Sequence, residues 1–147
     1  MNASARNRGR LVAKLYLDEQ VGDFHAPLQG DGHDVVVTGF PPRTARSDAW
    51  HFREAVSDGR IIITLNRSDF LYLHQLWTSL RTFELVPSHH RGILTTIQSG
   101  YWTRDEWLNA IRVKLQTPDA LLGRMAAWLR SSGQDRWLWE QWRADEE

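Results

Sequence analysis

The sequence predicts an α/β fold with a mostly parallel central sheet of four or five strands, covered by helices on both faces. Three observations lead to this prediction. Short apolar or β-branched runs recur along the first hundred residues, helical segments with capping residues lie between them, and no apolar run reaches the length of a membrane span. Hydrophobic residues make up 41% of the 147 residues, which is enough for one domain with a core.

Four apolar runs are predicted as strands, and the crossovers between them should be right-handed. These runs are residues 11–17, 34–38, 60–64 and 92–98. Three segments between them are predicted as helices, because they have capping residues, terminal glycines or apolar residues at helical spacing. These segments are 23–32, 47–59 (capped by Ser47 or Asp48) and 69–80. Two prolines and a glycine predict a loop over 39–46.

The chain after residue 100 has a helical pattern, which predicts a C-terminal extension of helices over 101–147, packed on the core or in an oligomer interface. Thr103 and Glu106 have the spacing of a capping box for a helix over 103–116. Thr117 followed by Pro118 predicts the start of a second helix over 117–130.

Tryptophans crowd this C-terminal third. If the segment 134–143 is helical, Trp137 and Trp139 cannot share a face, whereas Trp139 and Trp142 can. Some of these rings are expected to dock on the main body, which is the simpler interpretation. Any that stay exposed would mark a surface for self-association or for a protein partner, and a homodimer is the expected assembly.

Composition and charge exclude several classes of protein. The 18 basic and 18 acidic residues balance, so there is no overall attraction for nucleic acid. The lack of cysteine excludes disulfides, thiol nucleophiles and thiolate zinc sites. Residues 1–10 are polar and basic and lack the apolar centre of a secretory signal, and they are expected to form a flexible tail. A cytoplasmic location without membrane contact is therefore expected.

Oxygen-bearing side chains follow the predicted strands, at the point where each strand ends or the next helix begins. They are Asp18, Glu19, Asp48, Thr64, Asn66 and Asp69. In an open parallel sheet, ligands bind just beyond the carboxyl ends of the strands. Carboxylates crowded there repel one another unless a cation lies between them, and Mg²⁺ or Mn²⁺ prefers oxygen ligands. The pattern therefore predicts a divalent metal site at this edge of the sheet.

A simpler interpretation exists for several of these residues. Asp48, Asn66 and Ser68 are good helix N-caps, and each taken alone is more simply explained as a cap than as a ligand. Asp18 directly follows a buried strand and has no evident capping role. His74 is expected to be a partnered, half-buried histidine of the helix 69–80.

The remaining histidines give little support for a metal site of another kind. His89 and His90 precede the fourth predicted strand and could flank the same edge of the sheet. A histidine pair is compatible with zinc, but no third nitrogen or thiolate ligand lies at a useful spacing.

Several short motifs follow one another in a particular order. They are "LYLDEQ", "GHDVV", "SDAWHFREAVSDGRIIITLNRSDF", "LHQLW" and "HHRGIL". Together they resemble the PIN-like family of unknown function that is linked to toxin–antitoxin operons. The resemblance covers about residues 11 to 98 and implies a PIN-like three-layer sandwich over 11–100. It also implies a divalent metal site and ribonuclease activity, often as the toxin of a pair.

Carried over residue by residue, the resemblance implies an acidic set of Asp18, Glu19, Asp48 and Asp69. Asp18, Asp48 and Asp69 would bind Mg²⁺ or Mn²⁺, with Glu19 as a further ligand or base. Asn66 stands where many members of the family have an aspartate. A neutral amide binds Mg²⁺ less well than a carboxylate, so Asn66 is expected to be a weak ligand or to lie just outside the ligand set.

Three arginines flank the predicted acidic edge. Arg43, Arg46 and Arg67 are candidates to hold the phosphates of an RNA substrate, although surface arginines are more commonly just solvated.

Two functions fit the sequence. The leading hypothesis is a metal-dependent endoribonuclease of the PIN-like class, acting as a toxin with a cognate antitoxin protein. The alternative is a non-catalytic PIN-like interaction module, whose metal site is degenerate because of Asn66. A small-molecule α/β enzyme has no support, because the sequence contains no glycine-rich phosphate loop and no nucleophile elbow.

Overall fold

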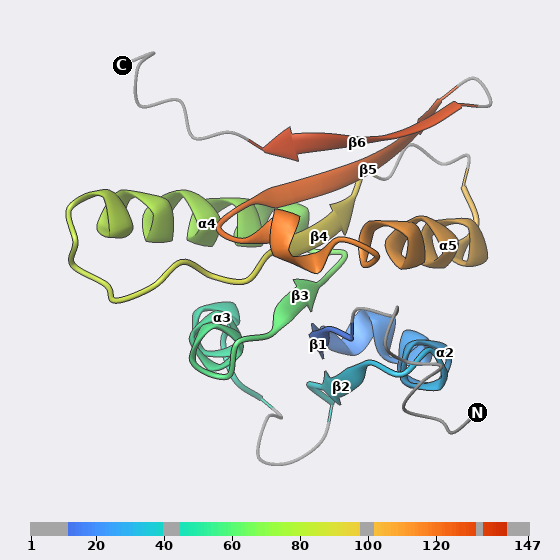
Figure 1. Cartoon of the computed structure of the whole chain (residues 1–147), viewed down its shortest axis with the longest axis horizontal. Helices are drawn as coiled ribbons and strands as arrows, with labels where there is room; N and C mark the ends of the chain where they lie inside the picture. Colours follow the sequence, from blue (N-terminus) through green and yellow to red (C-terminus); the bar gives the residue numbers. More distant parts are fainter. Residues whose placement is uncertain (1–11, 40–44, 98–101, 132–133, 141–147) are drawn as a thin grey trace, which may run out of the picture.

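A six-stranded sheet runs through the middle of the protein, with the strand order β2-β1-β3-β4-β5-β6 (Figure 1). The structure is a computed structural model, and it describes residues 12–39, 45–97, 102–131 and 134–140. Five strands are parallel and the sixth is antiparallel to its neighbour. The strands are β1 (Lys14–Leu17), β2 (Asp34–Val37), β3 (Ile61–Ile63), β4 (Ile93–Thr96), β5 (Met125–Ser131) and β6 (Gln134–Glu140).

Helices cover both faces of the sheet. They are η1 (Glu19–Phe24), α2 (His25–Gly30), α3 (Asp48–Ser57), α4 (Arg67–Thr82), α5 (Arg104–Lys114) and η2 (Pro118–Leu121). One core, on the side of η1, α2 and α5, includes Phe24, Leu28 and Trp107. The other core, on the side of α3 and α4, includes Phe52 and Phe70. The predicted α/β class, with a mostly parallel sheet between two helical layers, is confirmed.

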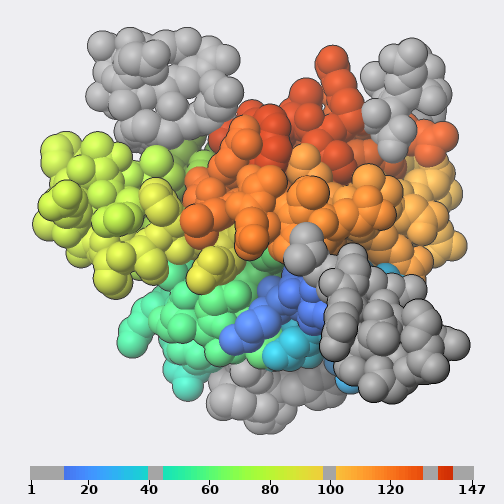
Figure 2. Space-filling model, viewed as in Figure 1, coloured from blue at the N-terminus to red at the C-terminus, as the bar shows by residue number. Residues whose placement is uncertain are grey.

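The space-filling view shows how these layers reach the surface. The end of α4 and the segment after it form the yellow-green flank of the molecule, and α5 forms part of the opposite flank (Figure 2). No helix in the part of the chain that the structure describes is long and apolar enough to cross a membrane.

The predicted helical C-terminal extension is largely wrong. Only the helix over 103–116 is confirmed, as α5 with its capping box of Thr103 and Glu106. The predicted helix over 117–130 is a short turn, η2, followed by β5. Gly123 lies between them with a left-handed φ of 68°, a backbone conformation that cannot continue a helix. The sheet therefore has six strands where four or five were predicted.

The tryptophan-rich segment is the strand β6 and not a helix. In a strand, residues two apart share a face, so Trp137 and Trp139 both pack against the core on the α5 side. Lys114 and Arg124 lie over the ring of Trp139, at 4.2 Å and 3.5 Å from its centroid. Trp142, like the predicted basic tail 1–10, lies outside the described residues. The described residues of the predicted extension are thus joined to the core through the sheet, by β5 and β6.

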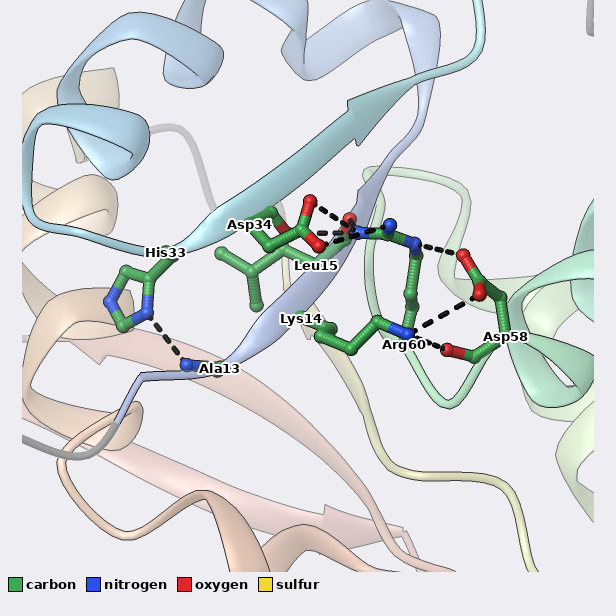
Figure 3. Close-up of polar contacts among 7 residues, drawn as sticks. All are labelled: Ala13, Lys14, Leu15, His33, Asp34, Asp58 and Arg60. Carbon is green, nitrogen blue, oxygen red and sulfur yellow. Dashed lines mark hydrogen bonds and ion pairs between the residues drawn. The ribbon is translucent and has the colours of Figure 1, made fainter.

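A polar network ties β1, β2 and the start of β3 together at the amino ends of the strands (Figure 3). Arg60 is only 8% exposed, and its guanidinium donates to the carboxylate and carbonyl of Asp34 and to the carbonyl of Leu15. Its Nε atom lies 2.5 Å from Oδ2 of Asp58, and Nζ of Lys14 donates to the other carboxylate oxygen, Oδ1 of Asp58, at 3.3 Å. This network lies at the opposite edge of the sheet from the carboxyl ends of the strands and serves the fold.

Candidate active site at the carboxyl ends of β1 and β3

The site lies where the order of the strands reverses. From β1 the chain moves to β2 on one side, and then crosses β1 to reach β3 on the other. A crevice outside the carboxyl ends of β1 and β3 is the place where open α/β sheets bind ligands. Asp18 directly follows β1, and Thr64 directly follows β3. The strand order therefore brings two of the predicted site residues to the switch point.

Two donors hold the Asp18 carboxylate in place. Oδ2 of Asp18 accepts from the hydroxyl of Thr64 at 2.8 Å, and Oδ1 accepts from the backbone N–H of Glu19 at 2.7 Å. The second bond makes Asp18 the N-cap of η1, so the expectation that it has no capping role is wrong. Thr64 is fully buried, so its hydroxyl is a rigid support for this carboxylate.

Asn66 joins the other two predicted carboxylates. Its Nδ2 atom lies 3.0 Å from Oδ2 of Asp48 and 2.8 Å from Oδ2 of Asp69. The backbone N–H of Asn66 also donates to the hydroxyl of Thr64 at 3.0 Å. Thr64 therefore links the Asp18 side of the site to the Asp48 and Asp69 side. One hydrogen-bonded network contains residues from three separate segments.

The interpretations of Asp48, Asn66 and Ser68 as capping side chains are wrong, and Ser68 lies within the first turn of α4. Ser47 is the N-cap of α3, with its hydroxyl accepting from the N–H of Trp50 at 3.2 Å. Asn66 occupies the N-cap position of α4 but makes no side-chain capping bond. Asp48 and Asn66 thus have side chains available to the site.

Crowding changes the proton affinity of Asp48. Partial burial, a hydrogen bond shared with Asp69, and the charges of Asp69 and Asp18 all raise the pKa of the Asp48 carboxyl. Only His51 acts in the opposite direction on that pKa. The negative charges at this edge therefore repel one another, which is the condition that favours a bound cation.

His51 and Tyr16 are site residues that the sequence analysis missed. They line a small cavity together with Asp18, Thr38 and Asp48, between the sheet and α3. The Tyr16 hydroxyl lies 2.7 Å from Nδ1 of His51. His51 follows Asp48 by three residues in α3, and this helical spacing could have identified it. Tyr16 gives no such signal, because it lies inside an apolar strand.

A shallow groove opens on the outer side of Asp48. Its volume is about 310 Å³, and it is lined by Ser47, Asp48, Ala49, Asp69, Tyr72 and Leu73. Asp48 also lines the small cavity, so this residue borders both the cavity and the groove. A ligand in the groove would therefore reach both Asp48 and Asp69.

The other predicted residues lie away from this group. Glu19 is exposed and lines a separate hollow with His25 and Gly39, on the η1 side of the sheet. Arg67 forms an ion pair with Glu140 at the end of β6, with 2.7 Å between Nε and Oε1. Arg46 is exposed, and its guanidinium lies 5.0 Å from the ring centroid of Trp50. Arg43 lies outside the described residues.

The buried histidines form a separate pair. Nδ1 of His74 lies 2.8 Å from Nε2 of His90, and Nδ1 of His90 accepts from the N–H of Gly92 at 3.1 Å. The donor from Gly92 requires the proton of neutral His90 to be on Nε2, from which it is donated to His74. Burial, together with the charges of His74 and His89, lowers the pKa of His90 to about 3. His74 is buried and partnered, and the pair serves packing.

The chemistry of the donors fits Mg²⁺ or Mn²⁺, although the side chains are not arranged as a closed cage. Among the residues that the structure describes, no group of three or more His, Asp or Glu side chains is placed to hold a metal ion. Mg²⁺ is commonly held by only one or two carboxylates together with waters and substrate phosphates. The pair of Asp48 and Asp69, bridged by the side-chain amide of Asn66, meets that need.

Comparison of the chain with protein-family models, with curated proteins and with solved structures finds no match. The function is therefore argued from the site.

Proposed function

We propose that this protein is a metal-dependent endoribonuclease of the PIN-like class, acting as the toxin of a toxin–antitoxin pair in the cytoplasm. The observation that supports it most is the network of oxygen donors at the switch point. Asp18, Asp48 and Asp69 come from three separate segments and are connected through Thr64 and Asn66. Neither a helix cap nor an ion pair within the described residues accounts for the meeting of Asp48 and Asp69.

Asp48 and Asp69 would hold Mg²⁺ or Mn²⁺, with the Asn66 amide oxygen as a third, weaker ligand. When bound, the cation would neutralise negative charge on a phosphodiester and lower the pKa of a water molecule that it binds. Asn66 now directs its NH₂ group at the two carboxylates, because a carboxylate oxygen can only accept. Binding would therefore require the amide to turn and present its oxygen.

The remaining residues position the reactants. Thr64 and the N–H of Glu19 keep the Asp18 carboxylate fixed beside the site. Asp48 would act as a metal ligand, since a bound cation lowers the pKa of a carboxyl that contacts it. The proposed role of Asp18 is to take a proton from the water that attacks the phosphorus, while the bond from phosphorus to the leaving oxygen breaks. Arg46, exposed on the α3 side, would contact a flanking phosphate.

One observation favours the alternative, a non-catalytic PIN-like interaction module with a degenerate metal site. Asn66 satisfies Asp48 and Asp69 without any cation. The function would then reside in a surface that binds a protein partner, such as the cognate antitoxin or a second copy of this chain. Leu76, Phe83 and Leu85 expose apolar surface on and after α4, which is suited to such a contact.

Cleavage of an RNA pool tests the proposal. The wild-type protein should cleave RNA with Mg²⁺ or Mn²⁺ and not with a chelator, and both Asp48→Asn and Asp18→Asn should lose this activity. Asp105→Asn is the matched control, since Asp105 is exposed on α5 and away from the site. Equal cleavage by all four proteins would point to a contaminating nuclease and remove the proposal.

Titration with Mn²⁺ in a calorimeter separates the two candidate functions. The nuclease requires heat of binding that Asp48→Asn abolishes. A folded wild-type protein that gives no heat with millimolar Mn²⁺ would favour the interaction module.

A further inference from the structure

The strand β6 lies at one edge of the sheet, and one of its two sides has no neighbouring strand. The strand order ends with β6, which pairs only with β5 (Figure 1). This edge strand has seven residues, whereas β2, at the opposite edge, has four. An edge strand presents a row of unpaired N–H and C=O groups, which can pair with another chain. Of the two open edges in the described part of the chain, β6 is therefore the longer.

The hydrogen bonds of β5 show which residues of β6 direct their backbone to the open side. The carbonyl of Trp128 accepts from the N–H of Ile97 at 2.9 Å, so the backbone groups of Trp128 point toward β4. Trp128 lies opposite Trp137 of β6, which makes the two a non-hydrogen-bonded pair. The N–H and C=O of Trp137 therefore point to the open side, as do those of Trp139 two residues later.

The side chains of β6 alternate between the two faces of the sheet. The two tryptophans pack against the core on the α5 side. The residues between and beside them therefore lie on the α4 side, and they are Arg136, Leu138 and Glu140. Glu140 forms its ion pair with Arg67 on that side. Arg136 is exposed and makes no hydrogen bond or ion pair with any residue that the structure describes.

We infer that the open edge of β6 pairs with the same edge of a second copy of this chain, antiparallel across a two-fold axis. With Leu138 at the axis, Trp137 lies opposite Trp139 of the second copy. Both residues direct their N–H and C=O outward, so the pair exchanges both backbone hydrogen bonds and the two sheets become one. No residue of the candidate site lies in β6, so this contact does not depend on nuclease activity.

Charge complementarity selects this register. With Leu138 at the axis, Arg136 lies opposite Glu140 of the second copy, and opposite charges at facing positions stabilise a strand pair. A register centred on Trp137 sets Arg136 against Leu138 instead. One centred on Trp139 sets Glu140 against Leu138, so neither of these registers forms the charge pair. Arg136, which has no partner among the described residues of its own chain, gains one in the dimer.

Sedimentation equilibrium of the full chain measures this contact. The wild type should be in equilibrium between monomer and dimer. Arg136→Glu should weaken the dimer at least about 5-fold, because it sets like charges opposite each other at both ends of the strand pair. Arg53→Glu makes the same change at an exposed position of α3 and should dimerise like the wild type. Both variants should keep the circular dichroism spectrum of the folded wild type.

A single introduced cysteine tests the register, because the chain has no cysteine of its own. Leu138→Cys sets two thiols opposite each other at the axis. The Cα atoms of such a non-hydrogen-bonded pair are about 4.5 Å apart, which a disulfide can span, so mild oxidation should link the dimer covalently. Arg136→Cys is the control. Its two thiols would lie about 13 Å apart and should not be linked, although position 136 is the more exposed.

Three results would overturn the pairing of β6 edges. A wild type that stays monomeric at every accessible concentration excludes the contact and leaves this edge to a strand of another protein. A dimer that Arg136→Glu weakens no more than Arg53→Glu must use another surface, such as the exposed apolar residues of α4. Faster cross-linking of Arg136→Cys than of Leu138→Cys excludes the register with Leu138 at the axis.

Discussion

The side-chain amide of Asn66 donates a hydrogen bond to Asp48, with 3.0 Å between Nδ2 and Oδ2, although 18 residues separate them in the chain. The same nitrogen donates to Asp69 at 2.8 Å. A neutral donor therefore lies between two carboxylates, in the place where a cation would neutralise them. The charge of residue 66 should decide how strongly this site binds a metal ion.

Asn66→Asp should exchange stability for metal affinity. Without metal, the variant loses both hydrogen bonds and gains a third carboxylate, so its free energy of unfolding should fall by about 2 kcal/mol. With Mn²⁺ it should bind more tightly than the wild type and recover stability. Calorimetric titration and thermal melts with and without Mn²⁺ measure both effects. Asn66→Ala is the control, since it loses the bridge without adding charge, and the idea fails if Asn66→Asp binds Mn²⁺ no better than Asn66→Ala.

Asp48→Asn should stabilise the metal-free protein near neutral pH. The pKa of Asp48 is raised in the folded state, so the folded protein binds a proton at Asp48 more tightly than the unfolded chain does. Ionised Asp48 therefore destabilises the fold at pH values above its raised folded pKa, and this penalty is lost as the pH falls from that pKa to the unfolded value of 3.8. The variant should melt higher than the wild type at pH 7 and equally at pH 3. A lower melting temperature at pH 7 would contradict the cause assigned to the shift.

The buried histidine pair should make the fold sensitive to acid. His90 has a pKa of about 3 in the folded state, against 6.5 for an ordinary histidine. In this pH range the unfolded chain therefore binds a proton at His90 that the folded chain does not bind. The free energy of unfolding should fall as the pH drops from about 6.5 toward 3. The slope should reach at most about 1.4 kcal/mol per pH unit.

Urea denaturation between pH 7 and pH 4 measures that slope. His90→Gln removes this titrating group and should reduce the slope, whereas His89→Gln, at the exposed neighbouring position, should change it only slightly, because His89 is the smallest cause of the His90 shift. Parallel curves for the wild type and His90→Gln would show that another group is responsible.

Arg60→Ala should destabilise the fold without altering the site. Arg60 is buried, while its partners Asp34 and Asp58 are about half exposed, so solvent screens part of the interaction. The loss of its charged hydrogen bonds should lower the free energy of unfolding by about 2–3 kcal/mol. Arg60→Lys should recover only part of this, because an ammonium cannot reproduce the two-pronged contact with Asp34. Arg53→Ala, at an exposed position of α3, is the control in urea denaturation.

The sequence was sufficient to predict several residues of the candidate site, but not the hydrogen bonds that connect them. The positions of Asp18, Asp48 and Asp69 at strand ends and helix starts follow from local patterns. The bridging role of Asn66 does not, because a residue at an N-cap position is expected to cap its own helix. This bridging role depends on the packing of α3 beside α4, which brings Asp48 within hydrogen-bond distance of Asn66. Glu19 was predicted as a site residue because it is adjacent to Asp18 in the sequence. It lines a different hollow, away from Asp48 and Asp69.

The sequence by itself determined the first four strands, the helices between them and the capped helix α5, since hydrophobic spacing and capping residues act within a few neighbours along the chain. Only the tertiary structure decided the form of residues 125–140. Met125–Trp128 is an apolar run that suits a helix or a strand equally well. Its burial beside β4, with β6 paired on the other side, is an interaction between distant segments. Such pairing outweighs local preference because it satisfies the backbone hydrogen bonds and buries the tryptophans together.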